Sequence, residues 1–178
     1  YSALDEFTKL ENQLNDWGFN KANLIGSKAQ VQFHKFFTLA HLQEKDKAWT
    51  ELKKSQKNAN DRIKLNEAAN QQDYDNLKQD QIADEAWYHI LFAEYEKAER
   101  KLAKVYEIQS KKEFVGALDQ YNGLYGMLYL MKGDPKSSLK YFNDRISVQN
   151  NTYFAYFKGL ALKATGQNDD AKSIFTEI

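Results

Sequence analysis

The sequence predicts an all-α fold with helices packed in pairs, and three observations support this prediction. Helix breakers are rare, since the 178 residues include one proline and eight glycines. Apolar residues recur every three or four positions through most of the chain, which is the period of an amphipathic helix. Near the C-terminal end, a set of small and aromatic residues repeats after 33 positions. Apolar residues make up 42% of the chain, which is enough to form a buried core.

The charge and cysteine content exclude several classes of function. Lys+Arg and Asp+Glu balance at 25 each without forming a basic stripe, so the sequence does not predict a nucleic-acid-binding protein. No apolar run approaches the roughly 20 residues that span a bilayer. The chain contains no cysteine, which excludes disulfides and thiolate metal sites.

The two ends of the sequence indicate whether it is part of a longer protein. It begins at Tyr1 without a recognisable leader and stops within a helical pattern at Ile178, so we expect a piece of a longer protein. The compartment stays open between the cytoplasm and, after removal of a leader, the periplasm or the cell exterior.

The N-terminal part of the sequence, 1–55, predicts three helices. Residues 3–17 have helical apolar spacing, with Ser2 as the N-cap and Gly18 after the last turn. Ser27 is the predicted cap of a second helix, which is apolar around much of its circumference and should therefore be buried. A turn over 43–46 then leads into a third helix, carried by Ala48, Trp49 and Leu52.

The middle of the chain allows more than one interpretation. Residues 56–81 are dominated by Asn, Gln, Asp and Lys, and we interpret them as a polar connecting segment, folded as a thinly anchored helix pair or as an extended polar helix. A long loop is disfavoured because such loops are uncommon in compact domains. Residues 82–118 again have helical spacing, as one long helix, as two helices with an unmarked turn near 93–97, or as a degenerate repeat.

Residues 119–178 contain the repeat, and a repeat of this length indicates stacked helix pairs. The matched landmarks are Gly126 with Gly159, Gly133 with Gly166, Ser138 with Ala171, and Phe142 with Phe175. We expect the first glycine of each unit to let its two helices approach closely, and the second to end the first helix with permissive backbone. The small residues should lie where the helices cross, and the two phenylalanines should fill the gap to the next helix pair.

This order of landmarks resembles the tetratricopeptide repeat family, which places a small residue, an aromatic residue, a turn glycine, an alanine and an aromatic residue within a unit of about 34 residues. Tyr129 and Leu162 occupy the first aromatic position of the two units. The family's early tryptophan is missing, where Asn122 and Ala155 stand, and Asn150 replaces the closing proline of the first unit. The resemblance implies a right-handed α-solenoid within a single domain over 1–178, with a less regular helical N-terminal half.

The resemblance extends to two degenerate units earlier in the chain. Neither unit contains a glycine at a landmark position. Their landmarks are Ala29, Phe36, Leu39, Gln43, Ala48 and Leu52 in one unit, and Ala86, His89, Ala93, Ala98 and Leu102 in the other.

The resemblance also implies a binding groove, because the first helix of each unit lines the concave surface in that family. By register, the groove positions are Gln120, Gly123, Met127 and Leu130 in one unit, and Tyr153, Tyr156, Leu160 and Lys163 in the next. Tyr121, Tyr125 and Tyr129 share one helix face, and two interpretations stay open for them, packing between repeats and lining a ligand groove. The groove is expected to be apolar and aromatic, which suits an extended or helical segment.

No pattern in the sequence selects a catalytic or metal site. His34 and His41 lie about 10 Å apart along a helix, too far to share one metal ion. His89 is expected to pair with Glu85 on a helix surface. The triplet from Asn150 to Thr152 matches a glycosylation acceptor by pattern only.

We therefore predict a non-enzymatic interaction or scaffold module, without cofactor or metal, that binds a peptide or helical segment of another protein. The alternative is a regulatory input domain of a larger signalling protein that senses a peptide or a small ligand. The last helix exposes Ile174 and Phe175 on an uncapped apolar face, so we also expect self-association through this helix.

Overall fold

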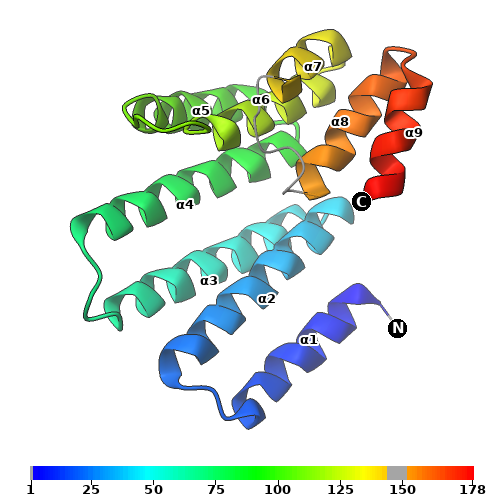
Figure 1. Cartoon of the computed structure of the whole chain (residues 1–178). Helices are drawn as coiled ribbons and strands as arrows, with labels where there is room; N and C mark the ends of the chain where they lie inside the picture. The colour runs from blue at the N-terminus through cyan, green and yellow to red at the C-terminus, as the bar shows by residue number, and fades with distance from the viewer. Residues whose placement is uncertain (1, 144–151) are drawn as a thin grey trace. The chain divides into compact units, whose positions relative to one another are not determined.

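The computed structural model describes residues 2–143 and 152–178, and every regular element within these two ranges is helical (Figure 1). Asn150 and Asn151 of the glycosylation triplet lie outside the described residues. The all-α prediction is confirmed. The chain divides into two compact units, Tyr1–Asp84 and Glu85–Ile178, whereas the sequence predicts a single domain over 1–178.

The N-terminal unit begins with α1 (Ala3–Gln13), which continues into a short 3-10 helix (Leu14–Trp17). Ser2 and Asp5 form a capping box at the start of α1. The Asp5 backbone N–H donates to Ser2 Oγ at 3.3 Å, and the Ser2 N–H donates to Asp5 Oδ2 at 3.0 Å. Gly18 has a φ of 68° and ends this segment in the left-handed conformation. The predicted start and end of the first helical segment are therefore confirmed.

The second helix starts earlier than the sequence predicts. Helix α2 spans Lys21–His41, and the side chain of its N-cap Asn20 accepts a hydrogen bond from the Asn23 N–H at 2.9 Å. Ser27 lies inside this helix, so the prediction that it caps the helix is wrong. Asn20 is preferred physically because it follows the chain reversal at Gly18 and ranks among the best N-cap residues.

The polar segment 56–81 belongs to two helices and the link between them. Helix α3 spans Lys45–Lys64 and α4 spans Gln71–Leu91, which matches the helix-pair alternative. Buried polar side chains explain why this composition still packs. Ser55 Oγ donates to the Ala29 carbonyl at 2.8 Å, and the Gln56 and Gln81 amides each donate to the other's backbone carbonyl at 3.1 and 3.3 Å.

The C-terminal unit contains the end of α4 and five further helices. These are α5 (Tyr95–Gln109), α6 (Asp119–Met131), α7 (Pro135–Asn143), α8 (Thr152–Ala164) and α9 (Asn168–Glu177). The turn between α4 and α5 selects the two-helix alternative for residues 82–118, and Ala93 sits in that turn with a φ of 55°. Helix α2 packs on α3, α6 on α7, and α8 on α9 (Figure 1). Stacking of the pairs into a right-handed superhelix stays a prediction.

Four turns along the chain share one geometry. Each contains a residue with positive φ, and the backbone N–H of the following residue donates to a carbonyl five positions back, as in a Schellman motif. The positive-φ residues are Gln43, Ala93, Gly133 and Gly166, and the hydrogen bonds measure between 2.8 and 3.0 Å. Five positions after each turn residue comes a buried small side chain, in the order Ala48, Ala98, Ser138 and Ala171. The two degenerate units therefore have the same local turn as the two clear ones.

The repeated glycines make room for the repeated phenylalanines. A Cβ atom added to Gly126 would lie 2.7 Å from the ring of Phe142, and one added to Gly159 would lie 2.5 Å from the ring of Phe175. Each ring thus fills space inside its own helix pair. That the two rings also fill the gap to the next pair stays a prediction.

Candidate functional site

The structure separates the predicted groove residues of α6 into different environments. Met127 has no exposed surface and belongs to the core, so it is removed from the predicted groove. Leu130 is half-buried. The Gln120 Oε1 atom accepts a hydrogen bond from Gln109 Nε2 at 2.9 Å, and Gln109 Oε1 accepts from the Tyr121 N–H at 3.2 Å. Gln109 is itself buried and anchors the start of α6, a role with no signal in the sequence pattern.

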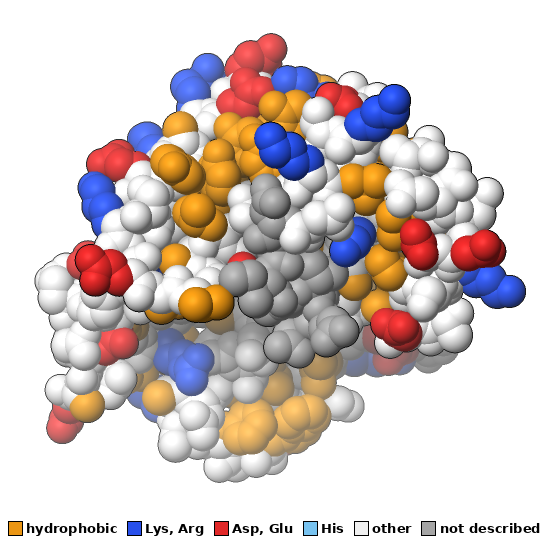
Figure 2. Space-filling view, turned by 45° about the horizontal axis from the view of Figure 1, so that its top comes forward, with side chains coloured by type: hydrophobic (Ala, Val, Ile, Leu, Met, Phe, Trp, Pro, Cys, Tyr) orange, Lys and Arg blue, Asp and Glu red, His pale blue; other side chains and the backbone are white. Residues whose placement is uncertain are grey.

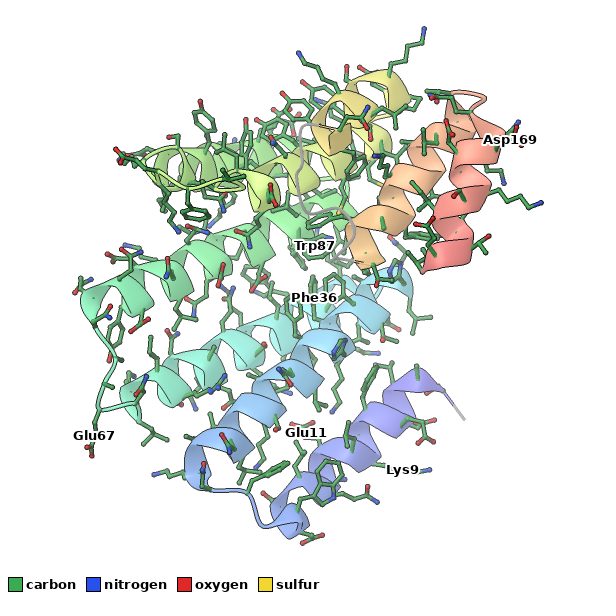
Figure 3. The ribbon with its side chains drawn as sticks, viewed as in Figure 1. Lys9, Glu11, Phe36, Glu67, Trp87 and Asp169 are labelled. Atoms are coloured by element: carbon green, nitrogen blue, oxygen red, sulfur yellow. The ribbon has the colours of Figure 1, made fainter. Side chains whose placement is uncertain are left out.

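A neighbouring helix occupies the predicted groove position of Gly123. A Cβ atom added to Gly123 would lie 2.8 Å from the ring of Phe154, at the start of α8. That ring is also stacked on Trp87 of α4, with ring centroids 5.4 Å apart, and Trp87 meets Tyr153 edge-on at 4.9 Å (Figure 3). Burial raises the pKa of Tyr153 to about 12. Tyr153 and Phe154 therefore contribute to packing within the unit.

The groove residues predicted on the last helix pair remain more accessible. Tyr156 is 45% exposed and lies 5.9 Å, centroid to centroid, from Phe175, which is 37% exposed. Leu160 is half-buried, and Lys163 is exposed. We call the surface formed by these four residues the terminal face; its members are Tyr156, Leu160, Lys163 and Phe175.

Five tyrosines from α5, α6 and α7 contact one another ring to ring. We call this group the tyrosine cluster; its members are Tyr106, Tyr121, Tyr125, Tyr129 and Tyr141. The centroid distances along this series are 5.0 Å from Tyr106 to Tyr121, 4.6 Å from Tyr121 to Tyr125, 5.1 Å from Tyr125 to Tyr141 and 5.4 Å from Tyr141 to Tyr129. Tyr106 is 46% exposed, and the other four are half-buried. The sequence pattern placed three of these tyrosines on one face but missed Tyr106 and Tyr141, which come from neighbouring helices.

Two hydroxyl groups of the cluster, those of Tyr121 and Tyr125, are held in their neutral form. Burial raises the pKa of Tyr121 above its ordinary value, and the neighbouring Tyr125 and Tyr141 raise it further. Burial likewise raises the pKa of Tyr125, although its hydrogen bond with the Tyr121 hydroxyl acts in the opposite direction. The cluster therefore offers aromatic faces together with the hydroxyl groups of Tyr121 and Tyr125, which remain protonated near neutral pH.

A cleft of about 620 Å³ begins at the Tyr106 end of the cluster. Two of its lining residues, Tyr106 and Tyr121, are members of the cluster, and Phe114 beside them is 61% exposed. Gly116, with a φ of 87°, shapes the loop that forms one wall. Figure 2 shows hydrophobic side chains gathered on the side of the molecule that carries α5 to α7, bordered by charged side chains. The cleft and the cluster are adjacent, because they share Tyr106 and Tyr121.

The N-terminal unit has a cleft of about 600 Å³, between α2, α3 and the first part of α4. None of the side chains that line it is aromatic, and they include Arg62, Asp73 and Asp80. This cleft therefore lacks the aromatic lining that is predicted for the binding surface.

The histidines have structural neighbours. His34 stacks on Phe7 with ring centroids 5.6 Å apart. His89 Nδ1 lies 2.7 Å from Glu94 Oε2, and Glu85 forms an ion pair with Lys101, so the pair of His89 with Glu85 stays a prediction. Within residues 2–143 and 152–178, no group of three acidic, histidine or cysteine side chains is placed to hold a metal ion.

Two further findings concern membrane crossing and similarity to known proteins. Among the described helices, none combines the length and the apolar character that a membrane crossing requires. Comparison with protein-family models, with curated proteins and with solved structures finds no match for this chain.

Proposed function

We propose that this chain is a non-enzymatic protein-interaction module, and that its tyrosine cluster holds an extended peptide segment of a partner protein. The observation that carries this proposal is the continuous surface of partly exposed tyrosine rings that leads into the cleft beside Tyr106 and Phe114. Isolated exposed aromatic residues are common on protein surfaces, but contiguous patches are typical of interaction sites.

The spacing of the rings suits an extended chain. Tyr121, Tyr125 and Tyr129 follow one another at intervals of four positions, which is about 6 Å along a helix axis. Two residues of an extended strand advance by roughly 6–7 Å and point to the same side. An extended peptide lying along α6 would therefore bring every second residue against one tyrosine of the cluster.

The chemistry of the cluster also favours binding. Tyrosine offers a large apolar face and a hydroxyl group that hydrogen-bonds peptide carbonyls, and its two side-chain torsions cost little entropy when they are fixed. In this cluster the rings already pack on one another, so less ordering remains to be done when a ligand binds. Truncation of such an anchor typically costs more than about 1 kcal/mol of binding free energy.

The proposal is tested by selecting peptides from a displayed random library against the full chain. The strongest peptides are then measured by calorimetry against the wild type, Tyr106→Ala and Tyr156→Ala. Tyr106 is largely exposed, so its removal should leave the fold intact. We expect Tyr106→Ala to weaken binding about 5- to 30-fold, the equivalent of about 1–2 kcal/mol.

Tyr156→Ala is the matched control, since it removes a tyrosine of similar exposure from the terminal face. It should leave these peptides bound as in the wild type. Selected peptides that ignore Tyr106→Ala, or that lose affinity with Tyr156→Ala instead, would contradict the assignment of the cluster.

A further inference from the structure

The cleft of about 600 Å³ in the N-terminal unit lies where three helices begin or end. The start of α2, the end of α3 and the start of α4 meet at the same end of this unit (Figure 1). We call this cleft the polar cleft, because its lining includes amide and charged side chains. All of its lining residues belong to one compact unit, and its volume is within the usual range of small-molecule sites.

Arg62 is held in the polar cleft by packing. A Cβ atom added to Gly26 of α2 would lie 3.0 Å from both Cδ and Nε of Arg62, so the arginine side chain runs across the space that the glycine leaves open. Among the residues that the structure describes, none forms a hydrogen bond or an ion pair with the Arg62 guanidinium group. Arg62 is also exposed, so its N–H donors are accessible to a ligand. An oxyanion therefore meets a guanidinium group that is already positioned and has no competing partner.

Two carboxylates of α4 restrict the charge of that ligand. Asp73 lies in the first turn of α4, and Asp80 lies seven positions later, about 10 Å along the helix axis. The Asn70 N–H donates to Asp73 Oδ2 at 2.9 Å, which fixes this carboxylate at the start of the helix. With one guanidinium group and two carboxylates in the lining, a dianion such as phosphate is repelled. A carboxylate joined to a cationic group is matched in both of its parts.

We infer that the polar cleft binds a small zwitterion, which is the chemistry of a free amino acid or of a short peptide with both ends free. Its carboxylate pairs with Arg62, and its ammonium group pairs with Asp73 or Asp80. This site lies in a different unit from the tyrosine cluster and does not depend on the function proposed for that cluster.

The uncharged part of the lining suits the rest of such a ligand. Ile63 and Leu77 are half-buried and offer apolar surface to an aliphatic side chain. Amide side chains in the same lining can hydrogen-bond a peptide group; they belong to Asn23, Gln30, Asn66 and Asn76. We therefore expect leucine, free or in a dipeptide, to be a suitable probe.

The test measures binding to the full chain by isothermal titration calorimetry. The probes are L-leucine and the dipeptide leucyl-leucine, each also in a form acetylated at the amino group and a form amidated at the carboxyl group. Comparison of the amino acid with the dipeptide distinguishes the two sources of the zwitterion. We expect at least one zwitterion to bind, and to bind about 10-fold or more tightly than either of its blocked forms, because each block removes a charge-assisted hydrogen bond.

Three charge variants identify the two ends of the ligand. Arg62→Gln should weaken the zwitterion about 10-fold or more and remove its advantage over the amidated form. Asp73→Asn and Asp80→Asn keep the shape of the side chain, and at least one of them should remove the advantage over the acetylated form. The matched control is Arg100→Gln, which removes an exposed arginine of α5 outside the lining and should bind as the wild type does.

Gly26→Ala tests the position of Arg62 while every charge stays in place. The new methyl group displaces the arginine side chain, so binding of the zwitterion should weaken about 3- to 10-fold. Alanine has better helix propensity than glycine, and the displaced atoms belong to a flexible side chain, so the fold should be kept. Circular dichroism checks the fold of every variant.

Three results would overturn the inference. The first is the absence of binding by both zwitterions at about 10 mM. The second is binding of the blocked forms as tight as that of the zwitterions, or of inorganic phosphate tighter than that of the zwitterions, which would assign the cleft to an uncharged ligand or to an anion alone. The third is an equal effect of Arg62→Gln and Arg100→Gln, which would show that Arg62 has no specific role.

Discussion

The ring of Phe142 lies so close to Gly126 that a Cβ atom at position 126 would come within 2.7 Å of it. The same relationship holds between Phe175 and Gly159, at 2.5 Å. Phe142 has no exposed surface, whereas Phe175 is partly exposed. The two glycine–phenylalanine pairs can therefore be compared directly. An alanine at position 126 meets the confined ring of Phe142, whereas an alanine at position 159 meets the ring of Phe175, which can move toward solvent.

Gly126→Ala should destabilise the chain by about 1–3 kcal/mol, the usual range for overpacking a core, partly offset by the better helix propensity of alanine. Gly159→Ala should cost less, even though its Cβ distance is shorter, because Phe175 has room to shift. Urea denaturation of both variants measures the difference. A larger cost for Gly159→Ala than for Gly126→Ala would contradict this account of the packing.

The left-handed turn residues lead to a stabilising prediction. Ala93 and Gln43 have φ values of 55° and 61°, a conformation that costs non-glycine residues about 1 kcal/mol. Ala93→Gly and Gln43→Gly should each raise the unfolding free energy by about 0.5–1 kcal/mol. Gly133→Ala and Gly166→Ala are the reverse substitutions and serve as controls. Both glycines have a φ of 82°, so each substitution should lower the unfolding free energy. Thermal denaturation of the four variants checks the signs, and destabilisation by Ala93→Gly would argue against the shared turn.

Ser138 is the polar member of a series of small residues that is otherwise alanine. Its hydroxyl group is buried and has no hydrogen-bond partner among the described residues. Ser138→Ala should therefore be neutral or stabilise the chain by about 1 kcal/mol, because an unsatisfied buried polar atom is removed. Chemical denaturation measures the change. A cost above about 1 kcal/mol would contradict the assignment of an unsatisfied hydroxyl at position 138.

The stabilisation that the contact between α1 and α2 contributes should depend on pH. Glu11 lies on the side of α1 that faces α2 and forms an ion pair with Lys35, while Gln32 donates to its other oxygen at 3.0 Å (Figure 3). Burial raises the pKa of Glu11, but the hydrogen bonds from Lys35 and Gln32 outweigh it, and the net pKa is lowered. Because the folded pKa is lowered, the stabilisation is present above the unfolded pKa of about 4.3 and is lost as the pH falls through the folded value.

Glu11→Gln is the variant that tests this contact. At neutral pH it should cost about 1–3 kcal/mol, because the buried Lys35 ammonium group loses its partner. The difference from the wild type should shrink as the pH is lowered below about 4. Denaturation curves of the two proteins across this range measure it, and a pH-independent difference would contradict the assignment to ionised Glu11.

Local signals in the sequence predicted much of the fold. The Ser2 cap, the left-handed Gly18 and the turns at Gln43, Gly133 and Gly166 follow from residues within a few positions of each feature. The turn at Gln43 follows from the polar run over 43–46, whereas a turn near Ala93 is one of the alternatives that the sequence leaves open. Ser27 was chosen as a cap because serine is a good cap residue, but Asn20 is equally good and lies nearer to the break at Gly18.

The candidate site was predicted less completely, because it depends on contacts between distant segments. Helical register placed Met127 in a groove, and no local signal shows that the helix pair would bury it. The tyrosines of α6 were found on one face, but their association with Tyr106 and Tyr141 depends on how α5 and α7 pack against α6. Polar residues that bridge helices, such as Gln56 and Gln81, have no periodic signal at all.

The central claim, that the tyrosine cluster binds a peptide, is tested most directly by nuclear magnetic resonance of the full chain with isotope-labelled tyrosine rings. Spectra are recorded without and with a saturating amount of a peptide selected as described above. The account predicts shifts in the ring signals of the cluster, at Tyr106, Tyr121, Tyr125, Tyr129 and Tyr141, while the signal of Tyr156 stays in place. Shifts confined to Tyr156, or a bound peptide that moves no signal of the cluster, would contradict it.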